Sequence, residues 1–233
     1  MSKSKQVAMI TGAAGNLGRA VAAALADDFR LVLVGNSLPH LRSAFPQAPE
    51  DWRLVEVDLS KQDDTDKRLG ELVSDVGRVD VLCAIAGAFR MGEAVHETST
   101  ETWDAMIDIN VRTFLNAARS VTPGMIANGH GRIITVGATA ALRGGAAMGA
   151  YAAAKSAVMR LTESMAAELG PKGINVNCVL PSVLDTPPNR AAMPDADPKT
   201  WVSPDDLAAV IRFLASDQAV AINGALIPVT GRG

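Results

Sequence analysis

Short runs of apolar residues alternate with longer stretches of helical periodicity from one end of the chain to the other. The runs, each with the length of a strand, occur at residues 6–11, 30–35, 53–58, 79–85, 131–137, 174–180 and 225–229. Amphipathic helical spacing is shown by Leu69, Leu72, Val73 and Val76, and again by Leu207, Val210, Ile211 and Leu214. The second helix is introduced by Ser203-Pro204, an N-cap hydroxyl followed by a proline at the first helical position. Apolar strands separated by helices are typical of a parallel sheet that is buried on both faces. The sequence therefore predicts an α/β fold with a doubly wound, seven-stranded parallel sheet and helices on both faces.

The length and charge of the chain limit what it can be. Its 233 residues fit a single domain over 1–233, and no segment approaches the roughly 20 apolar residues of a membrane span. The formal net charge is -3 and the basic residues are scattered, so we predict no nucleic-acid or membrane partner. The apolar stretch at residues 7–10 is too short for a signal-peptide core. We expect a cytoplasmic protein that binds a small molecule.

Residue types that often bind metals are present but are not grouped. Cys83 and Cys178 both lie within apolar runs and lack the spacing of a metal or redox pair. His40, His96 and His130 are far apart in the sequence and lack metal-ligand spacing. We therefore expect reduced core cysteines and no bound metal.

A glycine-rich turn follows the first predicted strand and opens into an alanine-rich helix. Its sequence is Thr11-Gly12-Ala13-Ala14-Gly15-Asn16-Leu17-Gly18. Glycines allow a tight turn and close approach of the backbone to a pyrophosphate, and the helix that follows offers free N–H groups. A plain turn between strand and helix is the alternative. The strand before and the helix after favour a dinucleotide site, with contacts expected from Gly12, Ala14, Asn16, Leu17 and Gly18.

Tyr151 and Lys155 are separated by four positions in an alanine-rich segment of helical character. Residues at this spacing lie on one face of a helix, so a phenol and an ammonium could act on the same substrate atom. The ammonium would favour the phenolate and lower the tyrosine pKa from its usual value of about 10. Taken alone, the pair is more often a half-buried tyrosine beside a solvated lysine. Its functional interpretation depends on the rest of the chain.

Together with Asp58, Asn110 and Pro181, these motifs resemble the short-chain dehydrogenase/reductase family over essentially the whole chain. The resemblance implies a Rossmann-type sheet, a nicotinamide cofactor and a homotetramer. It also implies catalytic roles for Tyr151, Lys155 and Asn110, the last by holding a water that relays protons to the lysine.

The same resemblance implies further cofactor contacts along the chain. Asp58 and Leu59 would meet the adenine, and Lys155 would also bind the nicotinamide ribose. The remaining implied contacts are Ala86 and Gly87 after the fourth strand and Pro181 and Thr186 after the sixth.

Several positions depart from the family pattern. Asn16 replaces a glycine of the loop, where an asparagine tolerates left-handed backbone. Ile85 and Ser182 also differ from the usual residues. The substrate-orienting serine is replaced by Ala138, and Thr139 should face the other way if the strand continues. Loss of one such donor costs an ordinary ketone reductase about 2.7–4 kcal/mol of transition-state stabilisation.

The proline-rich segment 182–203 follows the sixth strand and predicts a substrate lid, because ligands bind at the carboxyl ends of such strands. Its sequence, and the alanine at 138, are similar to quinonoid dihydropteridine reductases within the family. We therefore expect an NAD(P)H-dependent reductase of an activated imine or carbonyl acceptor, with a quinonoid dihydropterin as one example. A ketone or 3-oxoacyl thioester reductase is the first alternative. A nucleotide-binding sensor or scaffold with little catalysis is the second.

The end of the second predicted strand bears on the choice of nicotinamide. NAD-preferring proteins place an acid there to accept the ribose hydroxyls, and Asn36 and Ser37 offer none. Asn36, Ser37 and Arg42 could instead contact a 2′-phosphate. The sequence favours NADPH over NADH on this basis.

Overall fold

The computed structural model describes residues 5–231 and contains a sheet of seven parallel strands. The strands are β1 (Gln6–Thr11), β2 (Phe29–Gly35), β3 (Arg53–Glu56), β4 (Val81–Ala84), β5 (Gly131–Val136), β6 (Ile174–Pro181) and β7 (Leu226–Val229). Their order across the sheet is β3-β2-β1-β4-β5-β6-β7. The predicted fold class is confirmed, and all seven predicted runs form strands.

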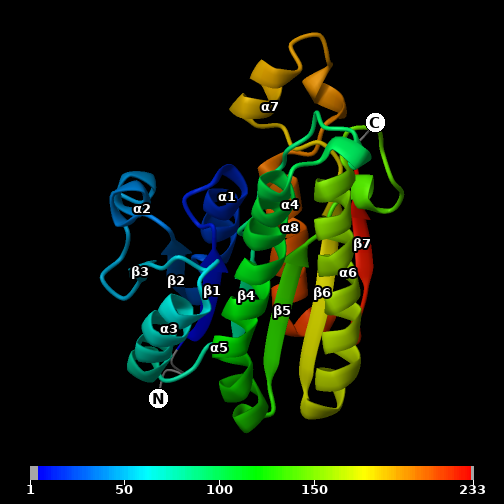
Figure 1. Ribbon diagram of the computed structural model, residues 1–233. Coiled ribbons are helices and arrows are strands. Elements are labelled where there is room, and N and C mark those ends of the chain that lie inside the picture. The colour runs from blue at the N-terminus through cyan, green and yellow to red at the C-terminus, as the bar shows by residue number, and fades with distance from the viewer. Residues whose placement is uncertain (1–4, 232–233) are drawn as a thin grey trace.

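Helices cover both faces of the sheet (Figure 1). On one face, α1 (Asn16–Leu25) and α8 (Pro204–Ala215) share a buried hydrophobic cluster with the central strands. On the other face, α3 (Gln62–Val76), α5 (Thr113–Asn128) and α6 (Gly149–Leu169) pack over a second cluster. The shorter helices α2 (Leu38–Ala44) and α4 (Thr100–Ile107) contact β3 and α6, respectively.

Helix α8 begins as its sequence predicts. The Ser203 hydroxyl accepts a hydrogen bond from the Asp206 backbone N–H at 3.0 Å, and Pro204 occupies the first position. Its apolar face buries Leu207 and Ile211 against the sheet. Capping and periodicity therefore agree in this element.

Two strands are shorter than predicted because polar groups turn the chain at their ends. The β3 run was expected to reach residue 58, but Asp58 N–H donates to the Asp64 carboxylate at 2.9 Å and leaves the ladder. The β4 run was expected to reach residue 85, but Ile85 N–H turns back to the Cys83 carbonyl at 3.0 Å. Hydrophobic patterning does not register such side-chain and turn contacts.

The carboxyl ends of all strands lie at one edge of the molecule, where segment 182–203 projects above the sheet (Figure 1). This segment contains the short helix α7 (Pro187–Ala192). Its two ends are held together, because Asp185 N–H donates to the Val202 carbonyl at 2.8 Å and Val202 N–H donates to Val183 at 2.9 Å. The segment therefore leaves the sheet edge and returns to it at the same place. No strand or long helix runs through it.

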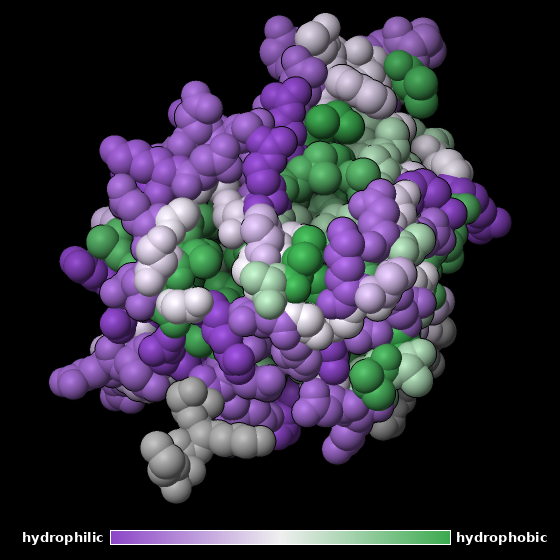
Figure 2. Space-filling view, turned by 90° about the horizontal axis from the view of Figure 1, so that it is seen from below, coloured by the Kyte–Doolittle hydropathy of each residue, from purple (hydrophilic) through white to green (hydrophobic). Residues whose placement is uncertain are grey.

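Figure 2 shows the surface of the molecule from below. Seen from that side, hydrophilic side chains predominate and hydrophobic ones gather in limited patches (Figure 2). Within residues 5–231, no helix is long and apolar enough to cross a membrane, and no group of three metal-binding side chains is placed to hold an ion. Residues 1–4 and 232–233 lie outside the described residues.

Candidate active site

The glycine-rich turn lies where β1 faces the end of β4, at the point where strand order reverses. Gly12 has φ +63°, and a Cβ at this position would lie 2.9 Å from Ala86 Cα. At Gly18 an added Cβ would lie 2.4 Å from the Gly12 carbonyl oxygen. Both positions therefore require glycine because backbone segments meet there.

The remaining residues of the turn take different places. Gly15 precedes α1 without a side-chain cap, and Asn16 is the first helical residue, its Oδ1 accepting from Arg19 at 2.9 Å. Asn16 does not use the left-handed backbone that an asparagine tolerates, since within residues 5–231 only Ala147 combines a positive φ with a side chain. Leu17 is buried in the core, while Ala14 is partly exposed.

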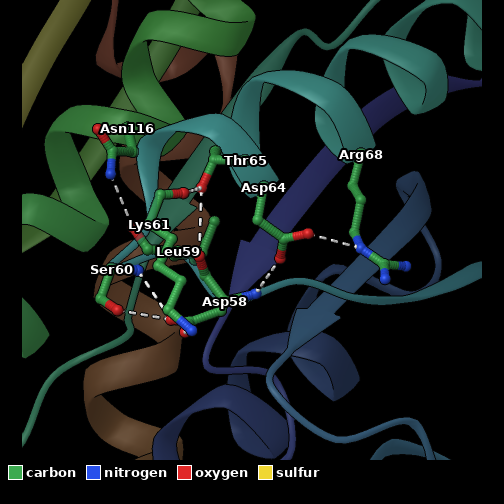
Figure 3. Close-up of polar contacts among 8 residues, drawn as sticks. All are labelled: Asp58, Leu59, Ser60, Lys61, Asp64, Thr65, Arg68 and Asn116. Carbon is green, nitrogen blue, oxygen red and sulfur yellow. Dashed lines mark hydrogen bonds and ion pairs between the residues drawn. The ribbon is translucent and has the colours of Figure 1, made fainter.

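The segment after β3 forms a polar network around Asp58 (Figure 3). Its carboxylate accepts hydrogen bonds from Ser60 N–H at 3.1 Å and Ser60 Oγ at 2.6 Å, and pairs with Lys61 at 3.1 Å. The bond from the Ser60 hydroxyl lowers the Asp58 pKa, burial opposes this shift, and the Lys61 partner lowers the pKa further. Buried Asn116 of α5 donates to the Leu59 carbonyl at 2.9 Å. Sequence analysis missed Asn116, since it depends on α5 packing beside α3.

An acidic side chain that the sequence analysis did not single out lies beside the end of β2. Ser37 caps α2 by accepting from His40 N–H at 3.3 Å, and the Asn36 residue is exposed. Glu56 at the end of β3 is paired in register with Gly35, and its carboxylate accepts from Leu38 N–H at 3.1 Å. An acid from the neighbouring strand thus stands beside a β2 end that has none of its own.

Asn110, Lys155 and Gly87 lie together at the carboxyl end of β4. A Cβ on Gly87 would lie 2.8 Å from Asn110 Oδ1 and 3.1 Å from Lys155 Nζ. The amide of Asn110 binds both backbone groups of Ala88, accepting from N–H at 3.2 Å and donating to the carbonyl at 3.1 Å. Lys155 Nζ donates to the Val136 carbonyl at 2.9 Å. Thus α6, the loop after β4 and the π-helical turn containing Asn110 converge on one point.

Tyr151 stands on α6 one turn before Lys155, with its ring in edge contact with Phe89 at a centroid distance of 4.8 Å and an angle of 86°. Burial raises the pKa of Tyr151 to about 12 and lowers the pKa of Lys155 to about 8. The expected fall in the tyrosine pKa is therefore wrong for this structure, because burial disfavours the phenolate. The phenol is a protonated donor at neutral pH.

The chain matches the model of the family described as short chain dehydrogenase over residues 6–197. The chain belongs to this family. It is 31% identical to nodulation protein G of Azospirillum brasilense over 98% of both chains, and 30% identical to 3-oxoacyl-(acyl-carrier-protein) reductase of Thermotoga maritima over 97% of this chain and 96% of that one. The crystal structure of 3-ketoacyl-(acyl-carrier-protein) reductase from Brucella melitensis, complexed with NADH, superposes with a TM-score of 0.88 at 28% identity, covering 99% of each chain. The protein is a short chain dehydrogenase, an oxidoreductase that uses NAD(P).

Within this short chain dehydrogenase, Ala138 occupies the position expected for a serine. Its methyl group belongs to a buried cluster against which Tyr151 packs. The neighbouring Thr139 hydroxyl donates to the Pro181 carbonyl at 3.3 Å. That hydroxyl is engaged with the end of β6, so it does not replace the missing donor in this arrangement.

The two expected contacts after β6 flank the start of segment 182–203. Pro181 is the last residue of β6, and Thr186 is buried, its hydroxyl accepting from Asn189 N–H at 3.4 Å as the cap of α7. Arg190 of α7 forms a two-point ion pair with Asp185, at 2.5 and 2.7 Å. The short helix is therefore fixed to its own preceding loop.

Proposed function

We propose that the protein reduces an activated carbonyl or imine acceptor, with Tyr151 as proton donor and Lys155 and Asn110 beside it. The observation that carries this proposal is the meeting of Asn110 and Lys155 at Gly87, with Ala138 in place of a hydroxyl residue. A bound reduced nicotinamide would supply a hydride to the acceptor carbon, with the electron pair of the C=O or C=N bond moving to the heteroatom. The Tyr151 phenol gives its proton to that atom, which balances the charge.

Lys155 and Asn110 support this transfer in different ways. The Lys155 ammonium would stabilise the phenolate that remains on Tyr151 and would bind the nicotinamide ribose. Asn110 keeps the loop after β4 in place through its two bonds to Ala88 and provides the anchor for a proton relay to the lysine. The phenol regains its proton along this route before the next turnover.

Ala138 is the reason to propose an activated acceptor. A simple ketone needs a second donor on its developing oxyanion, and one such donor is worth about 2.7–4 kcal/mol. An acceptor that is already electron-poor needs less stabilisation of the negative charge that develops in the transition state. The exposed ring of Phe89 beside Tyr151 adds an aromatic surface suited to a planar substrate. A quinonoid dihydropterin has both properties and is the example we propose.

A 3-oxoacyl thioester is the second candidate substrate. It is supported by the similarity to 3-oxoacyl-(acyl-carrier-protein) reductase of Thermotoga maritima and to the Brucella melitensis enzyme. Segment 182–203 would cover either substrate as a lid. The homotetramer remains a prediction that light scattering would check.

We assign the cofactor contacts by position. The pyrophosphate would meet the turn before α1, the adenine would meet the loop after β3, and the nicotinamide would lie between the ends of β4 and β6. The residues proposed are Gly12, Ala14, Asn16, Leu17, Gly18, Asn36, Ser37, Asp58, Leu59, Ala86, Gly87, Tyr151, Lys155, Pro181 and Thr186. The lack of an acid at the end of β2 supports a preference for NADPH. The Glu56 carboxylate opposes that preference, because its charge would repel the 2′-phosphate.

Turnover of different acceptors by the wild-type protein and by Ala138→Ser tests this function. Oxidation of NADH and NADPH would be followed with quinonoid dihydrobiopterin, a 3-oxoacyl thioester and simple ketones. We expect turnover of activated acceptors by the wild type, and a gain of roughly tenfold or more with simple ketones in Ala138→Ser. Ala140→Ser, a nearby hydroxyl outside the expected position, is the control.

The other outcomes would favour a different function or contradict the argument from the missing donor. Turnover of only the thioester would favour the second candidate. Equal turnover of simple ketones by wild type and Ala138→Ser would contradict the argument from the missing donor. Tight cofactor binding with no turnover of any acceptor would favour a sensor or scaffold.

A further inference from the structure

The choice between NADH and NADPH depends on the charges that surround the adenosine ribose. In Rossmann-type folds this ribose lies at the carboxyl end of β2, where an acid accepts its hydroxyls or a basic residue binds a 2′-phosphate. Here Asn36 and Ser37 follow β2, and Ser37 is already used as the cap of α2. Neither residue determines the preference by charge.

The fold brings a carboxylate to this place from the adjacent strand. Glu56 is the last residue of β3 and pairs with Gly35 in the parallel register. Its Oε2 accepts from Leu38 N–H at 3.1 Å. Glu56 is therefore tied to the residues immediately before and after Asn36 and Ser37, and its negative charge lies alongside both.

The second carboxylate oxygen remains free for a ligand. Within residues 5–231, Glu56 Oε1 has no hydrogen bond, and Glu56 itself is exposed. A ribose hydroxyl could donate to it, whereas a 2′-phosphate would bring about two negative charges beside it. The basic residues of this region are placed less directly, since Arg42 lies in the last turn of α2 and Arg19 is bonded to Asn16.

We propose that Glu56 is a specificity-determining residue that disfavours the 2′-phosphate and makes NADH the preferred cofactor. This assignment rests on the proposed NAD(P)H-dependent function. It reverses the preference expected from β2 alone, because the deciding acid comes from β3. The residue acts on the adenosine end of the cofactor and takes no part in hydride or proton transfer.

Direct binding of NADH and NADPH to wild type, Glu56→Gln and Glu71→Gln tests this proposal without requiring turnover. Glutamine keeps an oxygen that can accept from Leu38 N–H, so the fold should persist, and an unchanged thermal midpoint checks this. Glu71→Gln removes the same charge from an exposed site on α3, away from β2. A gain of roughly tenfold in NADPH affinity relative to NADH is expected for Glu56→Gln only.

The outcomes separate this proposal from the function on which it rests. Wild-type preference for NADPH, or an unchanged affinity ratio in Glu56→Gln, would overturn the role of Glu56 and leave the reductase proposal intact. An equal change in Glu71→Gln would reduce the effect to net charge and also overturn it. Failure of wild type to bind either nucleotide would contradict both proposals.

Discussion

Tyr151 is the only tyrosine in the chain, so its ionisation can be followed without interference from another phenol. Burial raises its pKa to about 12 in the structure, compared with about 10 for an exposed tyrosine. We expect the folded protein to show little phenolate absorbance up to about pH 10.5, and the unfolded protein to be largely ionised there.

The same titration examines the influence of Lys155. Its own pKa is lowered to about 8 by burial, so the ammonium is lost well before the phenol ionises. Ultraviolet difference absorbance of the wild type across this pH range is the measurement. A midpoint near 10 or below in the folded protein would contradict the effect of burial on the Tyr151 pKa.

The lysine also makes folding stability depend on pH. Its pKa in the folded state lies below the ordinary value of about 10.5, so the unfolded chain binds more protons between about pH 8 and 10.5. The Lys155 contribution to the free energy of unfolding therefore rises with pH across that interval. The thermal midpoint of the wild type should therefore rise relative to that of Lys155→Met between pH 7 and pH 10. An equal difference at both values would contradict a depressed lysine pKa.

At the scale of elements, Gly87 is the contact point between the loop after β4, the π-helical turn and α6. A methyl group there would press on Asn110 Oδ1 and Lys155 Nζ, at 2.8 and 3.1 Å. We expect Gly87→Ala to lower kcat by roughly 100-fold, because displacements of about 1 Å have effects of this size. Gly144→Ala is the control, since an added Cβ there meets nothing within 4 Å. Equal kcat values for the two variants would show that this contact does not position the site.

Elements also show what the sequence can and cannot predict. The strands were found because buried parallel strands are nearly continuous apolar runs, and α8 was found because its cap and apolar face agree. The ends of β3 and β4 were missed because Asp64 and a tight turn at Ile85 determine them. Hydrogen bonds of this kind are not visible in hydrophobic patterning.

The missed site residues have a common physical reason. Asn116 is 57 positions from Leu59 in the sequence. Glu56, at the end of β3, contacts Leu38 at the start of α2. Each becomes relevant only once strand order and helix packing place it beside a distant segment. Motif spacing identified Tyr151 and Lys155 because both lie on one helix.

At the scale of the whole molecule, the residues that form the hydrophobic core differ from the residues proposed to carry out catalysis. Two hydrophobic layers hold the sheet. Segment 182–203 projects above the carboxyl edge of the strands (Figure 1). The parallel order places the carboxyl ends of β1, β4 and β6 at the same edge of the sheet. Substitution of the proton donor should therefore remove catalysis and leave the fold and cofactor binding in place.

The central claim is best tested by comparing Tyr151→Phe with the wild type, using an acceptor that the wild type reduces. Loss of the reduced-nicotinamide absorbance gives turnover, and direct titration gives cofactor affinity. We predict that turnover falls by roughly 100- to 10,000-fold while cofactor affinity and the thermal midpoint change little. Full turnover by Tyr151→Phe would contradict the assignment of Tyr151 as the proton donor and, with it, the mechanism proposed for this site.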